Sequence, residues 1–98
     1  MKKFEICIKG KNFLVKINDK AKKHGFYAAR PVEARDTTEA VDAAMNSIRA
    51  ELKQDVLNDE SDPPIMCIED LYQVYSFEES MEIGEIKVPT KGFVWHEE

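Results

Sequence analysis

The sequence has few of the residues that mark a metal site, a disulfide framework or a targeting segment. It contains two cysteines, Cys7 and Cys67, and two histidines, His24 and His96, with no local pair at metal-ligand spacing. The N-terminus lacks the roughly 7–15 apolar residues of a signal peptide, and no stretch approaches the ~18 apolar residues of a membrane span. We therefore expect a cytoplasmic protein with both thiols free and with no metal or cofactor.

Combinations of residues that carry out catalysis are also missing. No base adjoins either cysteine, and no glycine-rich loop is present to cradle a phosphate. The acidic run over residues 55–62 lacks the glycine and terminal glutamate of a calcium loop. The adjacent carboxylates Glu69-Asp70 and Glu78-Glu79 would face opposite ways in strands. The sequence therefore favours a protein that is not an enzyme, and leaves open a site that is assembled only in three dimensions.

Charge is abundant but divided along the chain. Residues 1–35 carry ten Lys and Arg against three acids, a net of 10 − 3 = +7. Residues 36–98 carry four against sixteen, a net of 4 − 16 = −12, and the two halves sum to the −5 of the whole. Two interpretations follow: the halves neutralise each other in the fold, or one face is offered to a partner.

Alternating apolar residues predict strands in the basic half. Residues 3–9 and 12–17 place apolar side chains at every second position, and Gly10-Lys11 between them predicts the turn of a hairpin. Residues 26–35 return to strand, with Arg30 on the apolar face, and Pro31 indicates an edge strand or a bulge. The same alternation leaves Cys7 on the more accessible face of its strand.

Asp36 begins the helix that is predicted most clearly. Asp36 as N-cap and Glu39 three positions later approximate a capping box. The helix is expected to run to about Leu57, and Pro63-Pro64 ends it. One apolar stripe at helical spacing follows the cap, made of Val41, Ala44, Met45, Ile48 and Leu52.

After the helix, residues 65–77 predict a strand with a bulge or bend at Glu69-Asp70 and with Cys67 in the core. Residues 78–85 predict an acidic turn, and residues 92–96 a last short strand. These elements predict a single α+β domain over residues 1–98. Its fold is an antiparallel sheet of four to five strands, in the order β-β-β-α-β-β, with one long helix packed on one face. The other face would stay open, so we expect a homodimer in which a second copy covers it.

A basic loop over residues 18–25, with its flanks, is the candidate partner-binding site. Clustered cations fit a phosphate or the acidic surface of another protein. The alternative is a row of solvated lysines that guards a strand edge against aggregation. We also expect this loop, from the same chain or a second copy, to neutralise the acidic run that follows the helix. The candidate residues are Lys16, Lys20, Lys22, Lys23, His24 and Arg30.

Two resemblances add expectations. Gly25-Phe26-Tyr27-Ala28-Ala29-Arg30-Pro31-Val32-Glu33-Ala34, a capped helix and then Asp62-Pro63-Pro64-Ile65 resemble a small family of uncharacterised bacterial proteins, which implies no activity. Over about residues 3–75, the hairpin, third strand, Asp36-Thr37-Thr38-Glu39-Ala40 and helix are similar to the ββ(β)αβ half of HicB-like antitoxins, which have a partial ribonuclease-H-like fold. The chain lacks their Pro-Gly-Cys-type turn and DNA-binding domain. This resemblance therefore implies a protein-interaction role rather than operator binding.

Three hypotheses of function result. The first is a small cytoplasmic interaction module, homodimeric, that binds another macromolecule through a sheet edge or the basic loop. The second is nucleic-acid binding by the basic hairpin and loop, with an affinity that falls steeply as salt rises. The third is a small enzyme or ligand-binding dimer with a site between copies that would contain Cys7, His24 or His96.

Overall fold

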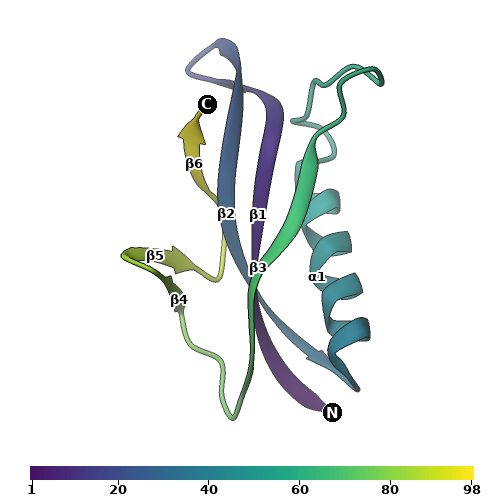
Figure 1. The fold of residues 1–98 in the computed structure, drawn as a ribbon, viewed down its shortest axis with the longest axis vertical. Helices are drawn as coiled ribbons and strands as arrows, with labels where there is room; N and C mark the ends of the chain where they lie inside the picture. Colours follow the sequence, from purple (N-terminus) through teal and green to yellow (C-terminus); the bar gives the residue numbers. More distant parts are fainter.

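Two long strands form the centre of the fold, and the computed structural model describes all residues from 1 to 98 (Figure 1). The predicted class is confirmed: one helix packs on an antiparallel sheet of four strands with the order β3-β1-β2-β6, and β4 pairs with β5 in a separate two-stranded sheet. No helix is long and apolar enough to cross a bilayer. The elements are β1 (Lys2–Ile17), β2 (Lys20–Ala34), α1 (Thr37–Leu52), β3 (Ile65–Val74), β4 (Ser80–Ile83), β5 (Ile86–Pro89) and β6 (Val94–Glu97).

The turn predicted at Gly10-Lys11 is wrong, because β1 continues through it to Ile17. The hairpin turns instead at Asn18 and Asp19, which have φ angles of 53° and 64°. Asn and Asp tolerate this left-handed region, and two such residues in a row suit a type I′ turn. Gly10 marks the start of a β-bulge, since the pairing of β1 with β2 shifts between Gly10 and Phe13. Most of the expected basic loop is therefore strand, because β2 begins at Lys20.

The helix begins as predicted. Asp36 is the N-cap, and its Oδ1 accepts a hydrogen bond from the backbone N–H of Glu39 at 2.9 Å. The helix ends at Leu52 rather than near Leu57. Beyond it the chain turns back to β1, where the Leu57 N–H donates to the Leu14 carbonyl at 2.8 Å. That long-range bond competes with another helical turn, so propensity alone does not locate the end of the helix.

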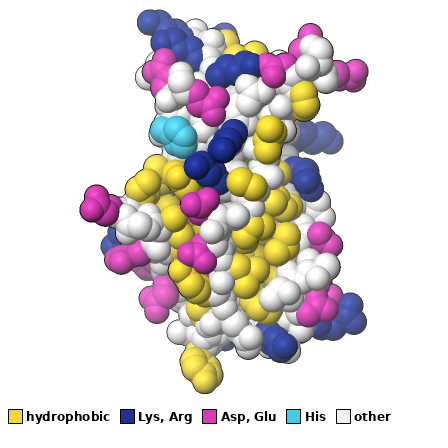
Figure 2. All heavy atoms as spheres, in the orientation of Figure 1, with side chains coloured by type: hydrophobic (Ala, Val, Ile, Leu, Met, Phe, Trp, Pro, Cys, Tyr) yellow, Lys and Arg dark blue, Asp and Glu magenta, His cyan; other side chains and the backbone are white.

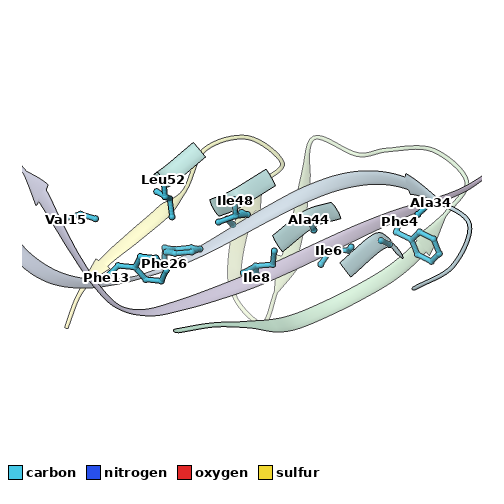
Figure 3. Close-up of a cluster of buried hydrophobic side chains, with 12 residues drawn as sticks. Phe4, Ile6, Ile8, Phe13, Val15, Phe26, Ala34, Ala44, Ile48 and Leu52 are labelled. Atoms are coloured by element: carbon cyan, nitrogen blue, oxygen red, sulfur yellow. The ribbon is translucent and has the colours of Figure 1, made fainter. Parts of the chain in front are cut away.

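The main core lies between α1 and the central strands (Figure 3). Every second residue of β1 faces the helix, including Phe4, Ile6 and Ile8, and Phe26 faces it from β2. Phe26 packs edge-on against Phe13, Phe93 and Trp95, with ring centroids 5.0, 5.2 and 5.3 Å away. The helix contributes Ala40, Ala44, Ile48 and Leu52 to this cluster.

The opposite face of the sheet is covered in part by the β4–β5 hairpin of the same chain. Met81 and Val88 of the hairpin pack on Cys7 and Ala29 in a second small buried cluster. The expectation that residues 78–85 form only a turn is therefore wrong, because Ser80–Ile83 is β4. The open face that suggested a second copy is occupied by this hairpin over that cluster.

Strand β3 carries the predicted bulge and lies at the edge of the sheet. Cys7 pairs with Asp70 and Ile8 pairs with Ile68, so Glu69 is the extra residue. β2, by contrast, lies between β1 and β6. Pro31 falls beyond the residues that β6 pairs with, which are His24–Tyr27. Pro31 therefore needs no donor on that side, although its strand is not the edge of the sheet.

Candidate interaction surface

The divided charge of the sequence is neutralised in part within the chain. Each of the four ion pairs joins a cation of residues 1–35 to an acid of residues 36–98. The acidic run after the helix is neutralised by the basic segment of the same chain, as expected, through Lys23 and Asp62. Four pairs agree with the first interpretation of the charge division: Lys22–Glu97, Lys23–Asp62, Arg30–Glu51 and Arg35–Glu39.

Arg30 is the most deeply buried of the candidate cations and is fully engaged. Its Nε and Nη2 donate to the two carboxylate oxygens of Glu51, each at 2.9 Å. Its Nη1 donates to the carbonyls of Ala29 and Gly92, and the guanidinium lies 5.1 Å from the ring centroid of Phe93. This planar, bidentate arrangement suits arginine. Arg30 therefore joins β2 to the helix and to the segment that precedes β6.

The other candidate residues separate into engaged and free side chains. His24 is buried, with Nδ1 2.9 Å from the Lys22 carbonyl and its ring edge-on to Trp95. Lys22 bonds Glu97 at 2.9 Å. Lys16 and Lys20 are exposed and take part in no ion pair of the structure. The structure thus brings the basic set onto neighbouring strands but leaves two of its six members unengaged.

The two exposed ion pairs at this end of the sheet make stability depend on pH. Hydrogen bonds from Lys23 and Asn12 lower the pKa of Asp62 below its ordinary 3.8. A hydrogen bond from Lys22 lowers the pKa of Glu97 below its ordinary 4.5. A carboxylate whose pKa is lowered by folding contributes stability that is present above its unfolded pKa and is lost as pH falls through its folded pKa.

We expect the double variant Lys22→Gln/Lys23→Gln to unfold at a lower urea concentration than the parent at about pH 7, and the gap to shrink at about pH 2.5. The gap should be small, since exposed ion pairs stabilise weakly. Lys16→Gln, which removes an unpaired lysine, is the matched control and should show no such gap at either pH. A gap of equal size at both pH values would contradict this assignment.

The structure reverses both expectations for the cysteines. Cys7 is buried beneath the β4–β5 hairpin, and this burial, with the nearby Glu69 and Asp70 charges, raises its pKa to about 11. Cys67 is exposed on β3 rather than in the core. The physical reason is the strand order, which places β3 at the edge. A thiol with a raised pKa is a poor nucleophile, and no group of three or more His, Cys, Asp or Glu side chains is placed to hold a metal.

Strand β3 presents the most distinctive surface. Its ten residues include none that is buried, and only β1 pairs with it, so its other edge is open. Ile65 and Tyr72 are 57% and 47% exposed. The Tyr72 hydroxyl donates to Asp70 at 2.6 Å, which raises the pKa of this tyrosine. Figure 2 shows a continuous band of hydrophobic side chains over the region where β3 and α1 lie, with Lys and Arg side chains at its upper end.

The stretch of sequence that contains β3 carries charge of one sign, although Lys3, Lys9 and Lys11 lie on the neighbouring strand β1. Residues 54–86, which contain β3, carry no Lys or Arg. The absence of Lys and Arg from this stretch is the sequence signal that could have identified the edge as a candidate surface. The basic residues of the other half pointed instead to a segment that contains ion-paired side chains. The ten acids of the stretch are Asp55, Asp59, Glu60, Asp62, Glu69, Asp70, Glu78, Glu79, Glu82 and Glu85.

A groove lies where the last turn of α1 meets the start of β3. It encloses about 290 Å³. Its apolar lining comes from Phe13, Leu52, Val56 and Met66, with Pro64 beside them, and two cations, Arg49 and Lys53, complete it. Neither cation belongs to the site that the sequence predicted.

Comparison of the chain with family models, with curated proteins and with solved structures finds no match. The resemblances to a bacterial family and to HicB-like antitoxins therefore remain expectations.

Proposed function

We propose that this chain is a small protein-interaction module that accepts an extended segment of another protein along the open edge of β3. The observation that carries the proposal is an edge strand of ten residues, none of them buried. An open edge presents unpaired N–H and C=O groups, and strand addition satisfies them while pockets beside the strand take alternate side chains. Exposed apolar side chains such as Ile65 and Tyr72 would be covered in the same step.

Charge favours a segment rich in Lys and Arg as the partner. The stretch of sequence that contains β3, residues 54–86, carries ten acids and no Lys or Arg, and cross-strand pairs of opposite charge are favourable. Two β3 strands paired across a two-fold axis would bring like charges together, so the same argument disfavours a second copy at this edge. An acidic partner at the basic segment, which the sequence favoured, would find Lys22, Lys23 and Arg30 already bonded within the chain.

The proposed setting is a reducing cytoplasm. Cys7 and Cys67 form no disulfide, and Cys67 is exposed to solvent on β3. Disulfides are rare and exposed thiols persist in such a compartment.

Site-specific photocrosslinking in lysate of the native host tests the proposal. A benzophenone amino acid is placed at Tyr72 on β3 or, as control, at Ile86 on β5, which is 41% exposed. We expect crosslinks from Tyr72, absent from Ile86, to a Lys- or Arg-rich segment of one protein. We also expect Glu69→Lys to weaken them severalfold, whereas Glu85→Lys in the β4–β5 turn should leave them unchanged.

Other outcomes contradict the proposal. Crosslinks between two copies of this chain would identify a homodimer instead. Crosslinks lost on nuclease treatment would indicate nucleic acid. Equal labelling from Tyr72 and Ile86, or no labelling from β3, would show that this edge is not an interface.

A further inference from the structure

We infer that the bound segment is a chain terminus: the groove beside the start of β3 holds the last side chain of the partner, and Arg49 and Lys53 bind its C-terminal carboxylate. This inference rests on the proposed function and specifies the class of ligand, an extended segment with a free C-terminus. Three independent features support it, namely strand direction, the apolar lining of the groove and the placement of two cations.

Strand direction brings the end of an added strand to the groove. All pairings in the four-stranded sheet are antiparallel, and antiparallel pairing is slightly the more stable arrangement. A segment that adds antiparallel to β3 runs from the level of Val74 towards Ile65. Its C-terminal end therefore reaches Pro64 and Met66, which line the groove.

The groove has the size and lining for one apolar side chain. Its volume of about 290 Å³ is just below the roughly 300–1,000 Å³ of ligand pockets. Phe13 and Leu52, both almost fully buried, contribute to its lining. Burying one more large aliphatic or aromatic side chain there removes apolar surface from water and is favourable. An apolar last residue is therefore expected in the partner.

The two cations are placed where a carboxylate would lie. Arg49 and Lys53 are the only Lys or Arg in residues 36–86, and both line this groove. Neither takes part in an ion pair, and the one side-chain partner of Arg49 is the neutral Asn46 oxygen, 3.1 Å from Nη1. Charge-assisted hydrogen bonds from two cations suit a terminal carboxylate better than an internal peptide group.

A random heptapeptide library, synthesised once with free C-terminal carboxylates and once as C-terminal amides, tests this inference on the intact chain. We expect binders from the free-acid library, with an apolar last residue enriched. The best of them should bind about tenfold more tightly than their own amides, about 1.4 kcal/mol. Arg49→Gln/Lys53→Gln should reduce that preference to less than about threefold. Lys87→Gln/Lys91→Gln, with the same change in net charge, should preserve it.

Thermal unfolding of both double variants checks that their folds are intact, and a merely structural role for Arg49 and Lys53 would leave the acid-to-amide ratio unchanged. Equal binding of acids and amides would overturn the capture of a terminus and leave strand addition at β3 standing. Absence of binders from both libraries would overturn the inference too, while crosslinking from Tyr72 would decide separately whether β3 is an interface at all.

Discussion

The variant Ile48→Asp is expected to be unfolded at room temperature. Ile48 is fully buried, on the face of α1 that packs against β1 and β2. The change loses the burial of a large side chain, about 1.5–3 kcal/mol, and adds the larger cost of burying a carboxylate in an apolar cluster. The total approaches the ~5–15 kcal/mol by which domains are stable. Circular dichroism should show neither native helix content nor a cooperative thermal transition.

Ala43→Asp is the matched control, because Ala43 is on the same helix but exposed. It should remain folded and lose only the small propensity difference, about 0.5 kcal/mol or slightly more. Met45→Lys should fall between the two, since Met45 is only half-buried and a lysine head can reach water. A folded Ile48→Asp with parental stability would contradict the placement of the helix.

Replacing Gly10 by valine is expected to produce the second-largest effect. A Cβ at Gly10 would lie 2.1 Å from Cε2 of Phe26, and two further atoms of the ring are within 2.6 Å. The ring cannot swing away, because Phe13, Phe93 and Trp95 surround it. Overpacking of this kind costs about 1–3 kcal/mol, and urea unfolding should show it as a lower midpoint with an unchanged slope.

A second substitution tests whether a collision with the Phe26 ring is the cause of the destabilisation expected for Gly10→Val. Phe26→Leu alone should destabilise the protein, but in the Gly10→Val background it should cost much less, because it removes the colliding ring. A favourable coupling of about 0.5–3 kcal/mol is the expected result of this double-mutant cycle. Gly25→Ala is a useful comparison: its Cβ would meet the exposed His96 ring at 2.3 Å and the Gly10 carbonyl oxygen at 3.0 Å, and the closer of these neighbours is a surface side chain rather than a buried ring. Strictly additive effects at Gly10 and Phe26 would contradict the packing described for this pair.

Features set by nearby residues were predictable from the sequence. The N-cap at Asp36 depends on a residue three positions away, and the bulge at Glu69 is visible as a break in alternation. The neutralising contact between Lys23 and the acidic run followed from the sign of the two segments. In each case the physical cause is a local residue pattern or the sign of the charge, and both can be read directly from the sequence.

Features set by strand order were not predictable. The hairpin turn was assigned to Gly10, although this glycine is needed for the close approach of Phe26 from the neighbouring strand. The exposures of Cys7 and Cys67 were both reversed, because they depend on the β4–β5 hairpin and on the edge position of β3. The candidate site could not be predicted for the same reason. The sequence shows where cations cluster, but only the fold shows which of them already form ion pairs.

The central claim is that β3 has an open edge that can pair with a further strand. Amide hydrogen exchange of the isolated protein tests this claim most directly. The account predicts that residues of β3 alternate between protected amides, which bond to β1, and amides that exchange about as fast as exposed loops. Along Lys3–Gly10 of β1, the part that is paired on both sides, the amides should be protected. Uniform protection along β3 would contradict the account, because it would mean that the edge is already covered.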